Sequence, residues 1–263
     1  DLGKYTDIHP FRDAYPERFF NVGMAEQNLV AVAAGLARTG KQPFATTYGV
    51  FASRRAFDFV AIALAHSNLD VKLVAGLPGL TTGYGGTHQA IEDLALMRMI
   101  PGLTIIDPMD ATEIDAATVA MSDHRGPVYM RLLRGAVPVV LEPGYRFEIG
   151  KARQLRDGKD VGIISTGLMS ERAVDAAALL EKRGISVAVL HVPTIKPFDA
   201  ETVAAFAASV GQLVTAENHV VVGGLASLVV ETLFDAGIVR KVTRIGLPDR
   251  YIECGAVPTL QQK

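Results

Sequence analysis

The sequence predicts an α/β protein built of two consecutive parallel-sheet α/β domains, and three observations lead to this. Short apolar runs alternate with segments of helical apolar spacing from about residue 43 onward. Hydrophobic residues make up 49% of the 263 residues, which is enough for a solid core. A turn-rich stretch at 141–146 interrupts the alternation. Strands that alternate with helices form parallel sheets covered on both faces, so we expect one domain over 1–140 and a second over 141–263.

The first domain opens with residues 1–16, in which Pro10 and Pro16 favour a loop. We find no strand before this segment, and we expect the sequence to begin inside a domain whose first strand is missing. A helix is predicted over 24–38, with Gly40 as its C-terminal stop. Apolar spacing predicts strands at 43–48, 71–75, 103–107 and 128–133 and helices at 51–66, 89–99 and 111–121.

The second domain repeats the alternation of strand and helix. The same spacing predicts strands at 161–165, 187–192, 212–215 and 242–245 and helices at 170–183, 200–208 and 223–236.

Composition excludes several classes of function. The net charge of −2 provides no basic surface for nucleic acid, and every apolar run is interrupted before the ~18 residues that a membrane span needs. No spacing typical of a protein metal site occurs. Cys254 is the only cysteine, so no internal disulfide can form, and we expect a cytoplasmic protein.

A buried carboxylate is predicted at Glu26. Phe19, Phe20 and Gly23 lead into a helix in which Glu26 lies in the first turn and residues 29–37 are almost wholly apolar. A helix that is apolar all round is buried, and its dipole favours a carboxylate at the N-terminus. Two interpretations stay open: Glu26 caps the helix, or it lies in a dry cleft and shares a proton with a ligand nitrogen.

The segment 21–28, NVGMAEQN, resembles the R-x-x-x-x-G-I-x-E-x-x motif of the pyrimidine-binding domain of the transketolase family. The resemblance continues through TTYGVF at 46–51, GYGGTHQ at 83–89, ENH at 217–219 and GLPDR at 246–250. It therefore covers essentially the whole chain, with the pyrimidine domain followed by the C-terminal domain of that family.

The resemblance implies a catalytic subunit that uses thiamine diphosphate to move a two-carbon ketol unit from a ketose phosphate to an aldehyde. Glu26 would contact the aminopyrimidine ring and promote loss of the C2 proton. Tyr48 and Phe51 match aromatic positions that cradle this ring, although their spacing also fits plain core packing. Arg54 stands where many transketolases carry another aromatic residue, on the far side of the pocket.

Substrate contacts are implied in the same way. His88 matches the histidine of the family's D-G-x-T-H motif, which contacts substrate hydroxyls near the reacting carbon. Tyr84 stands at the aspartate of that motif, so we expect a different acceptor preference. Arg134 matches an arginine that binds the sugar phosphate, although an exposed arginine at a strand end needs no such role. Gly76 and Tyr5 replace a histidine and a serine, which indicates an unusual sugar or one held partly by a partner.

The family's Gly-Asp-Gly motif, which holds the diphosphate and Mg²⁺, does not occur in this sequence. We therefore expect a second polypeptide to carry that domain and the metal ligands, with the cofactor bound between the two chains. Two copies of each chain would form an α2β2 heterotetramer. Asp1 aligns with a family aspartate near the cofactor.

Three alternatives stay open. Two are enzymes of the same plan, the β-subunit of a 2-oxoacid dehydrogenase and 1-deoxyxylulose-phosphate synthase; the third is a non-catalytic assembly or regulatory subunit. Thr87-His88-Gln89 resembles the sugar enzymes rather than the 2-oxoacid group, which has paired histidines. His219 is interpreted as structural, and His191 as an ordinary surface or packing histidine.

Overall fold

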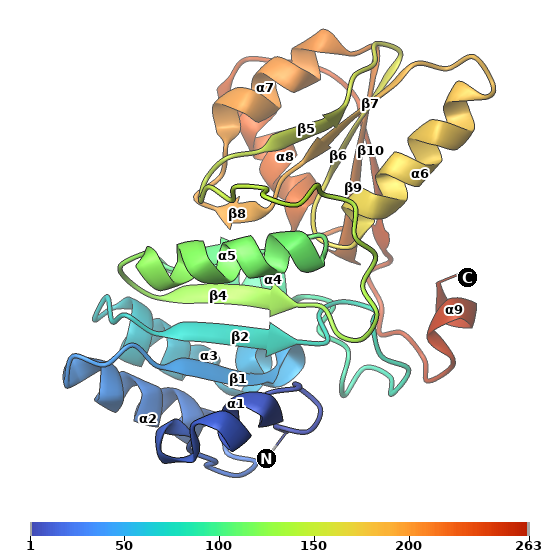
Figure 1. Cartoon of the computed structure of the whole chain (residues 1–263). Helices are drawn as coiled ribbons and strands as arrows, with labels where there is room; N and C mark the ends of the chain where they lie inside the picture. Colours follow the sequence, from blue (N-terminus) through green and yellow to red (C-terminus); the bar gives the residue numbers. More distant parts are fainter. Residues whose placement is uncertain (1, 262–263) are drawn as a thin grey trace.

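The computed structural model describes residues 2–261, which form two five-stranded sheets with helices packed against them (Figure 1). The first sheet has the strand order β1-β2-β4-β3-β8 and the second the order β10-β9-β6-β7-β5. Neighbouring strands run parallel except at one edge of each sheet. There β8 pairs antiparallel with β3 in the first sheet, and β5 pairs antiparallel with β7 in the second. The predicted α/β class with two sheets is confirmed, and the expectation of purely parallel sheets is corrected at these edges.

The first sheet follows the predicted alternation closely. Its strands from the first half of the chain are β1 (Phe44–Tyr48), β2 (Lys72–Gly76), β3 (Thr104–Ile106) and β4 (Val128–Leu132). The main helices are α2 (Glu26–Arg38), α4 (Asp93–Arg98) and α5 (Ala111–Asp123). Between β1 and β2 the chain forms two π-helical segments, η2 (Phe51–Arg55) and η3 (Val60–Ala65), joined by α3 (Phe57–Phe59). π-helical turns are frequent at functional sites, and this one follows directly from the strand that carries Tyr48.

The second sheet contains β5 (Arg153–Arg156), β6 (Val161–Ser165), β7 (Val187–His191), β9 (Gln212–Val220) and β10 (Val242–Leu247). Its helices are α6 (Met169–Glu181), α7 (Ala200–Ser209) and α8 (Leu225–Asp235).

Several short elements correct the predictions. The opening segment, expected to be a loop, contains α1 (His9–Ala14) and the 3₁₀ turn η1 (Pro16–Arg18). Both prolines lie in the first turn of their helix, where a missing N–H costs nothing. Three further elements were not predicted: β5, β8 (Thr194–Lys196) and α9 (Val257–Leu260). The predicted helix 89–99 is shortened to α4.

Helix α2 is not buried all round, contrary to the expectation. Val30, Ala33 and Ala34 face the core, whereas Ala31 and Gly35 are exposed. Alanine is the best helix former and is tolerated on solvent-facing positions, so an alanine-rich run does not measure burial. Glu26 itself is buried, with 4% of its surface exposed.

The two halves share one core. A single cluster of buried apolar side chains runs from Val30 and Leu73 in the first half to Leu190 and Val229 in the second. Strand β8 belongs by sequence to the second half but completes the first sheet, pairing with β3. The side chain of Lys196 in this strand donates hydrogen bonds to two carbonyl oxygens at the end of α4.

Buried polar groups also connect the two halves of the chain. His191, at the end of β7, lies with its Nε2 2.8 Å from Glu113 Oε2 on α5, while Ser170 Oγ lies 2.6 Å from Nδ1. All three residues are fully buried. His191 is therefore part of a polar network between the halves, which corrects its interpretation as an ordinary packing residue. Glu113 also accepts a hydrogen bond from the hydroxyl of Tyr145, at 2.9 Å.

Candidate cofactor and substrate site

Glu26 is the first residue of α2, and its carboxylate is held by an arginine. Arg55 Nη1 donates to Glu26 Oε2 at 2.7 Å. The Arg55 side chain is 43% exposed, so this ion pair links a buried carboxylate to the surface. Arg55 also lies over the ring of Phe51, with its guanidinium carbon 4.5 Å from the ring centroid. Arg55 therefore contacts both the Glu26 carboxylate and the Phe51 ring.

The predicted aromatic residues form one cluster. Tyr48, the last residue of β1, and Phe51, the first of η2, stack with ring centroids 5.8 Å apart and planes 20° apart. His88 approaches both rings edge-on, at 6.4 Å from Tyr48 and 5.5 Å from Phe51. Tyr84 meets the His88 ring at 5.5 Å. The structure thus brings together four side chains that come from two separate segments, and the cluster presents flat apolar faces beside a polar imidazole.

Tyr84 and His88 lie on a glycine-rich loop, residues 79–88, between β2 and α4. Tyr84 is 63% exposed, and His88 is half-buried. The Thr87 hydroxyl lies 2.9 Å from His88 Nδ1, so this contact uses Nδ1 and not Nε2. This loop therefore offers a positioned imidazole next to the aromatic wall.

Arg54 faces the glycine-rich loop rather than Glu26. Its side chain pairs with Glu92, donates to the carbonyl oxygen of Gly86 at 2.7 Å, and lies 5.6 Å from the ring centroid of Tyr251. The Glu92 carboxylate raises the pKa of Arg54 further above its ordinary value. Its predicted role as a cofactor contact remains a prediction. The neighbouring Arg55 makes the contact with Glu26, and the sequence reasoning missed it.

Arg134 and Tyr5 lie at the same end of the first sheet as Tyr48. The Arg134 guanidinium lies 5.8 Å from the ring centroid of Tyr5, and its Nε lies 3.3 Å from an Asp7 carboxylate oxygen. Burial raises the pKa of Tyr48, and the nearby positive charge of Arg134 partly opposes that rise. A cation thus stands close to the aromatic wall, half-exposed and able to turn toward an anion.

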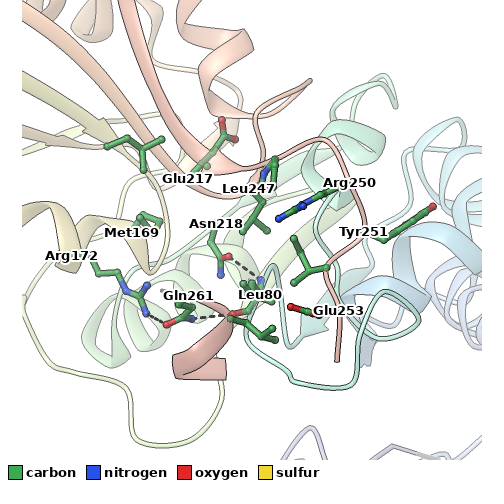
Figure 2. Close-up of a pocket in the computed structure, with 15 residues that line it drawn as sticks. Leu80, Met169, Arg172, Glu217, Asn218, Leu247, Arg250, Tyr251, Glu253 and Gln261 are labelled. Atoms are coloured by element: carbon green, nitrogen blue, oxygen red, sulfur yellow. Dashed lines mark hydrogen bonds between the residues drawn. The ribbon is translucent and has the colours of Figure 1, made fainter. Parts of the chain in front are cut away.

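A separate pocket of about 510 Å³ lies beyond this cluster, where the second sheet meets the loop at Leu80 (Figure 2). Glu217 and Asn218 on β9 form one wall, and Arg250 and Tyr251, after β10, form another. The Glu217 carboxylate accepts hydrogen bonds from the first two N–H groups of α8, at 2.7 and 3.0 Å, and burial raises its pKa to about 7.

The family models decide the identity of the fold. Residues 2–139 match the transketolase pyrimidine-binding domain, and residues 150–263 match the transketolase C-terminal domain. The chain belongs to the transketolase family. Within the part that the structure describes, no helix is long and apolar enough to cross a membrane.

Several relatives of this transketolase-family chain match it over most of their own length. A Sinorhizobium fredii protein described as an uncharacterized transketolase family protein is 60% identical over 99% of this chain and 76% of its own length. The 6-deoxy-6-sulfo-D-fructose transketolase subunit of a Clostridium species is 42% identical over 100% of this chain and 82% of its own. Among solved structures, a split-gene transketolase described as an inactive β4 tetramer matches with a TM-score of 0.87 and 44% identity, over 95% of this chain and 81% of its own.

The residues of this transketolase-family chain fit one half of thiamine diphosphate. A buried carboxylate and a stacked aromatic wall suit a flat, nitrogen-containing ring. Among residues 2–261, no group of three acidic, histidine or cysteine side chains could hold a metal ion. Asp1, matched by resemblance to an aspartate near the cofactor, lies outside the described residues.

Proposed function

We propose that this chain is the pyrimidine-side subunit of a two-chain transketolase. The observation that carries the proposal is the buried carboxylate of Glu26 beside the cluster of Tyr48, Phe51 and His88. Thiamine diphosphate, when bound, supplies the carbanion that cleaves and re-forms a carbon–carbon bond. A second chain would hold the diphosphate and Mg²⁺, and the two chains would assemble in pairs as an α2β2 heterotetramer.

In this proposal Glu26 holds a proton at a ring nitrogen of the pyrimidine, because a carboxylate in a dry cleft can share a proton with a nitrogen base. Arg55 fixes the carboxylate from one side and stays reachable from solvent, so it can turn away when the ring arrives. Tyr48 and Phe51 pack against the ring and exclude water from it.

His88 serves the substrate side. Its imidazole lies against both aromatic rings and can donate a hydrogen bond to an oxygen on which charge develops. Arg134 would pair with the anionic group at the far end of the sugar, because a guanidinium forks onto phosphate or sulfonate oxygens. The name of the Clostridium relative adds a sulfonated ketose to the donors worth testing.

The test is reconstitution with a chain that carries a diphosphate-binding domain. The complex is assayed with thiamine diphosphate and Mg²⁺, offering fructose 6-phosphate, 6-deoxy-6-sulfofructose and pyruvate as donors. Ketol transfer from either sugar supports the proposal. Consumption of pyruvate alone would assign the chain to the 2-oxoacid or deoxyxylulose enzymes instead.

Glu26→Gln provides the decisive variant, and we expect it to lower kcat by a factor on the order of 10² or more while the complex still assembles. The matched control is Glu142→Gln, which changes an exposed glutamate in the segment that connects β4 to β5. This variant should keep full activity. Equal turnover of the Glu26→Gln and Glu142→Gln complexes would refute the role of Glu26. A complex that assembles but turns over none of the donors would favour a non-catalytic subunit.

A further inference from the structure

The chain leaves the second sheet at the end of β10 and returns to the first half as an irregular segment with bends at 249–250 and 254–255; we call residues 248–255 the strap. The strap runs beside the glycine-rich loop 79–88, and its N–H at Gly255 donates to the carbonyl oxygen of Gly83 at 3.0 Å. In Figure 2 Arg250, Tyr251 and Glu253 of the strap lie on the side of the pocket opposite Met169 and Arg172, with Leu80 of the loop nearby.

Three glycines of the loop lie closely against the strap, and at Gly83 and Gly85 a side chain would require the strap to shift. A Cβ on Gly83 would overlap the carbonyl oxygen of Gly255. A Cβ on Gly85 would lie 2.6 Å from the Cys254 sulfur, and one on Gly86 would lie 3.1 Å from the Tyr251 ring. Absence of side chains at these positions is therefore explained by the approach of the strap.

Arg54 contacts both the loop and the strap. Its guanidinium donates to the Gly86 carbonyl oxygen at 2.7 Å, pairs with Glu92, which lies between the loop and α4, and lies 5.6 Å from the Tyr251 ring centroid. One cation thus contacts the loop at Gly86, the segment after the loop at Glu92, and the strap at Tyr251. The ring of Tyr251 contributes to this contact through the cation–π attraction.

The same loop is anchored at its start by the second sheet. Asn218 on β9 accepts a hydrogen bond from the N–H of Leu80 at 2.9 Å, and a Cβ on Gly79 would overlap the Asn218 carbonyl oxygen. Two points of the loop, Leu80 and Gly83, are therefore held by elements of the second half of the chain.

We propose that the strap is a positioning element that holds Tyr84 and His88 in place for the sugar substrate, with Tyr251 as its main side chain. This inference rests on the proposed function for its effect on catalysis, but its structural part does not. The C-terminal half would thereby set how well the substrate is bound without touching the substrate.

The first experiment uses Cys254, the only cysteine of the chain, as a reporter of the contact. Cys254 is exposed, but its sulfur faces Gly85, so the loop shields the thiol from one side and its reaction rate with an aromatic disulfide reagent rises when the strap leaves the loop. We expect Gly85→Ala to raise that rate about threefold or more, because the new methyl group displaces the sulfur and the strap opens locally.

Gly184→Ala is the matched control. Gly184 has a φ of +78°, nearly equal to the +79° of Gly85, but no atom lies within 4 Å of its missing Cβ. Alanine meets an unfavourable positive φ in both variants, and only Gly85→Ala meets the strap. Equal thiol rates in the two variants would overturn the proposed contact, whether or not the complex proves to be a transketolase.

The second experiment measures catalysis in the reconstituted complex. Tyr251→Ala should raise the KM for the sugar about threefold or more with kcat less affected, since Arg54, which holds the loop at Gly86, loses its cation–π partner but Glu26 keeps its place. Tyr251→Phe keeps the ring and should restore the KM, which a general loss of stability would not do. An unchanged KM in Tyr251→Ala, with wild-type turnover present, refutes the positioning role. Absence of turnover in the wild-type complex refutes the proposed function instead, and the thiol rates then decide on the strap.

Discussion

Removing the charge of Arg131 should be among the most destabilising single changes in this protein. Arg131 lies on β4 with only 2% of its side chain exposed, and it forms an ion pair with the fully buried Asp93 through two nitrogens. It also reaches Asp107 at 3.4 Å and the backbone carbonyl of Asn218 on the second sheet, likewise at 3.4 Å. Burial alone would raise the pKa of Asp93, but the Arg131 charge outweighs burial and holds that pKa below its ordinary value.

Arg131→Met keeps an apolar side chain similar to the aliphatic part of arginine, removes the guanidinium and leaves Asp93 without its ion-pair partner. Breaking a buried pair in this way costs about 3–5 kcal/mol, because an uncompensated charge stays in the interior. That is a large part of the ~5–15 kcal/mol that stabilises a typical protein. At about 2–4 °C per kcal/mol for a chain of this size, the midpoint of thermal unfolding should fall by roughly 10 °C.

The assay is thermal and urea unfolding of the purified chain followed by circular dichroism. Arg125→Ala serves as the control, because that side chain is 91% exposed and its contact with Asp70 is 3.5 Å long. We expect the control to cost no more than about 0.5 kcal/mol. The double variant Asp93→Asn with Arg131→Met should recover much of the loss, since it removes both charges of the Arg131–Asp93 pair. If Arg131→Met cost no more than Arg125→Ala, the reasoning about buried charge would be wrong.

Three further predictions concern stability and pH. The pKa of Glu217, about 7 in the folded protein, lies above its ordinary value of 4.5, so the folded state binds this proton more tightly than the unfolded chain does. The contribution of Glu217 to the free energy of unfolding is full below pH 4.5 and falls by up to about 3 kcal/mol as the pH rises to 7. Urea unfolding at several pH values should show that Glu217→Gln lacks this decrease. Glu26→Gln should change the unfolding free energy by less than about 1 kcal/mol, because the exposed Arg55 gives a screened ion pair; a larger loss in urea unfolding would show that the pair is structural. Tyr145→Phe removes a hydrogen bond to the buried Glu113 and should cost about 1–3 kcal/mol by the same assay, whereas no loss would mean that water replaces the hydroxyl.

Periodicity found the long elements of this fold because each alternates or repeats along its own sequence. Strands such as β6 and β7 are short apolar runs whose neighbours in the sheet are parallel, and they stand out without reference to distant residues. The edge strands were missed for the opposite reason. Strand β5 has the sequence RQLR, which carries no apolar run, and β8 has three residues; each is a strand only because a partner strand accepts its hydrogen bonds.

The candidate site shows the same division. Glu26, Tyr48, Phe51 and His88 could be named because motifs at fixed spacing carry them, and the structure places the three ring-bearing residues in one cluster. Arg55 could not be named, because nothing in a run of two arginines says which one turns toward a carboxylate 29 positions away. That choice depends on the π-helical turn of η2, which rotates successive side chains differently from an α-helix.

The placement of β8 has a practical consequence for anyone who wishes to divide this protein. A fragment that ended near residue 140 would contain β3 but not the strand that borders it, so the backbone of Ile105 and Ile106 would be left open to solvent. Open strand edges recruit other strands, and such a fragment is expected to aggregate or to pair with its own copies. The two halves match separate family domains, but β8 of the second half completes the sheet of the first. A stable truncation would therefore have to keep residues 194–196.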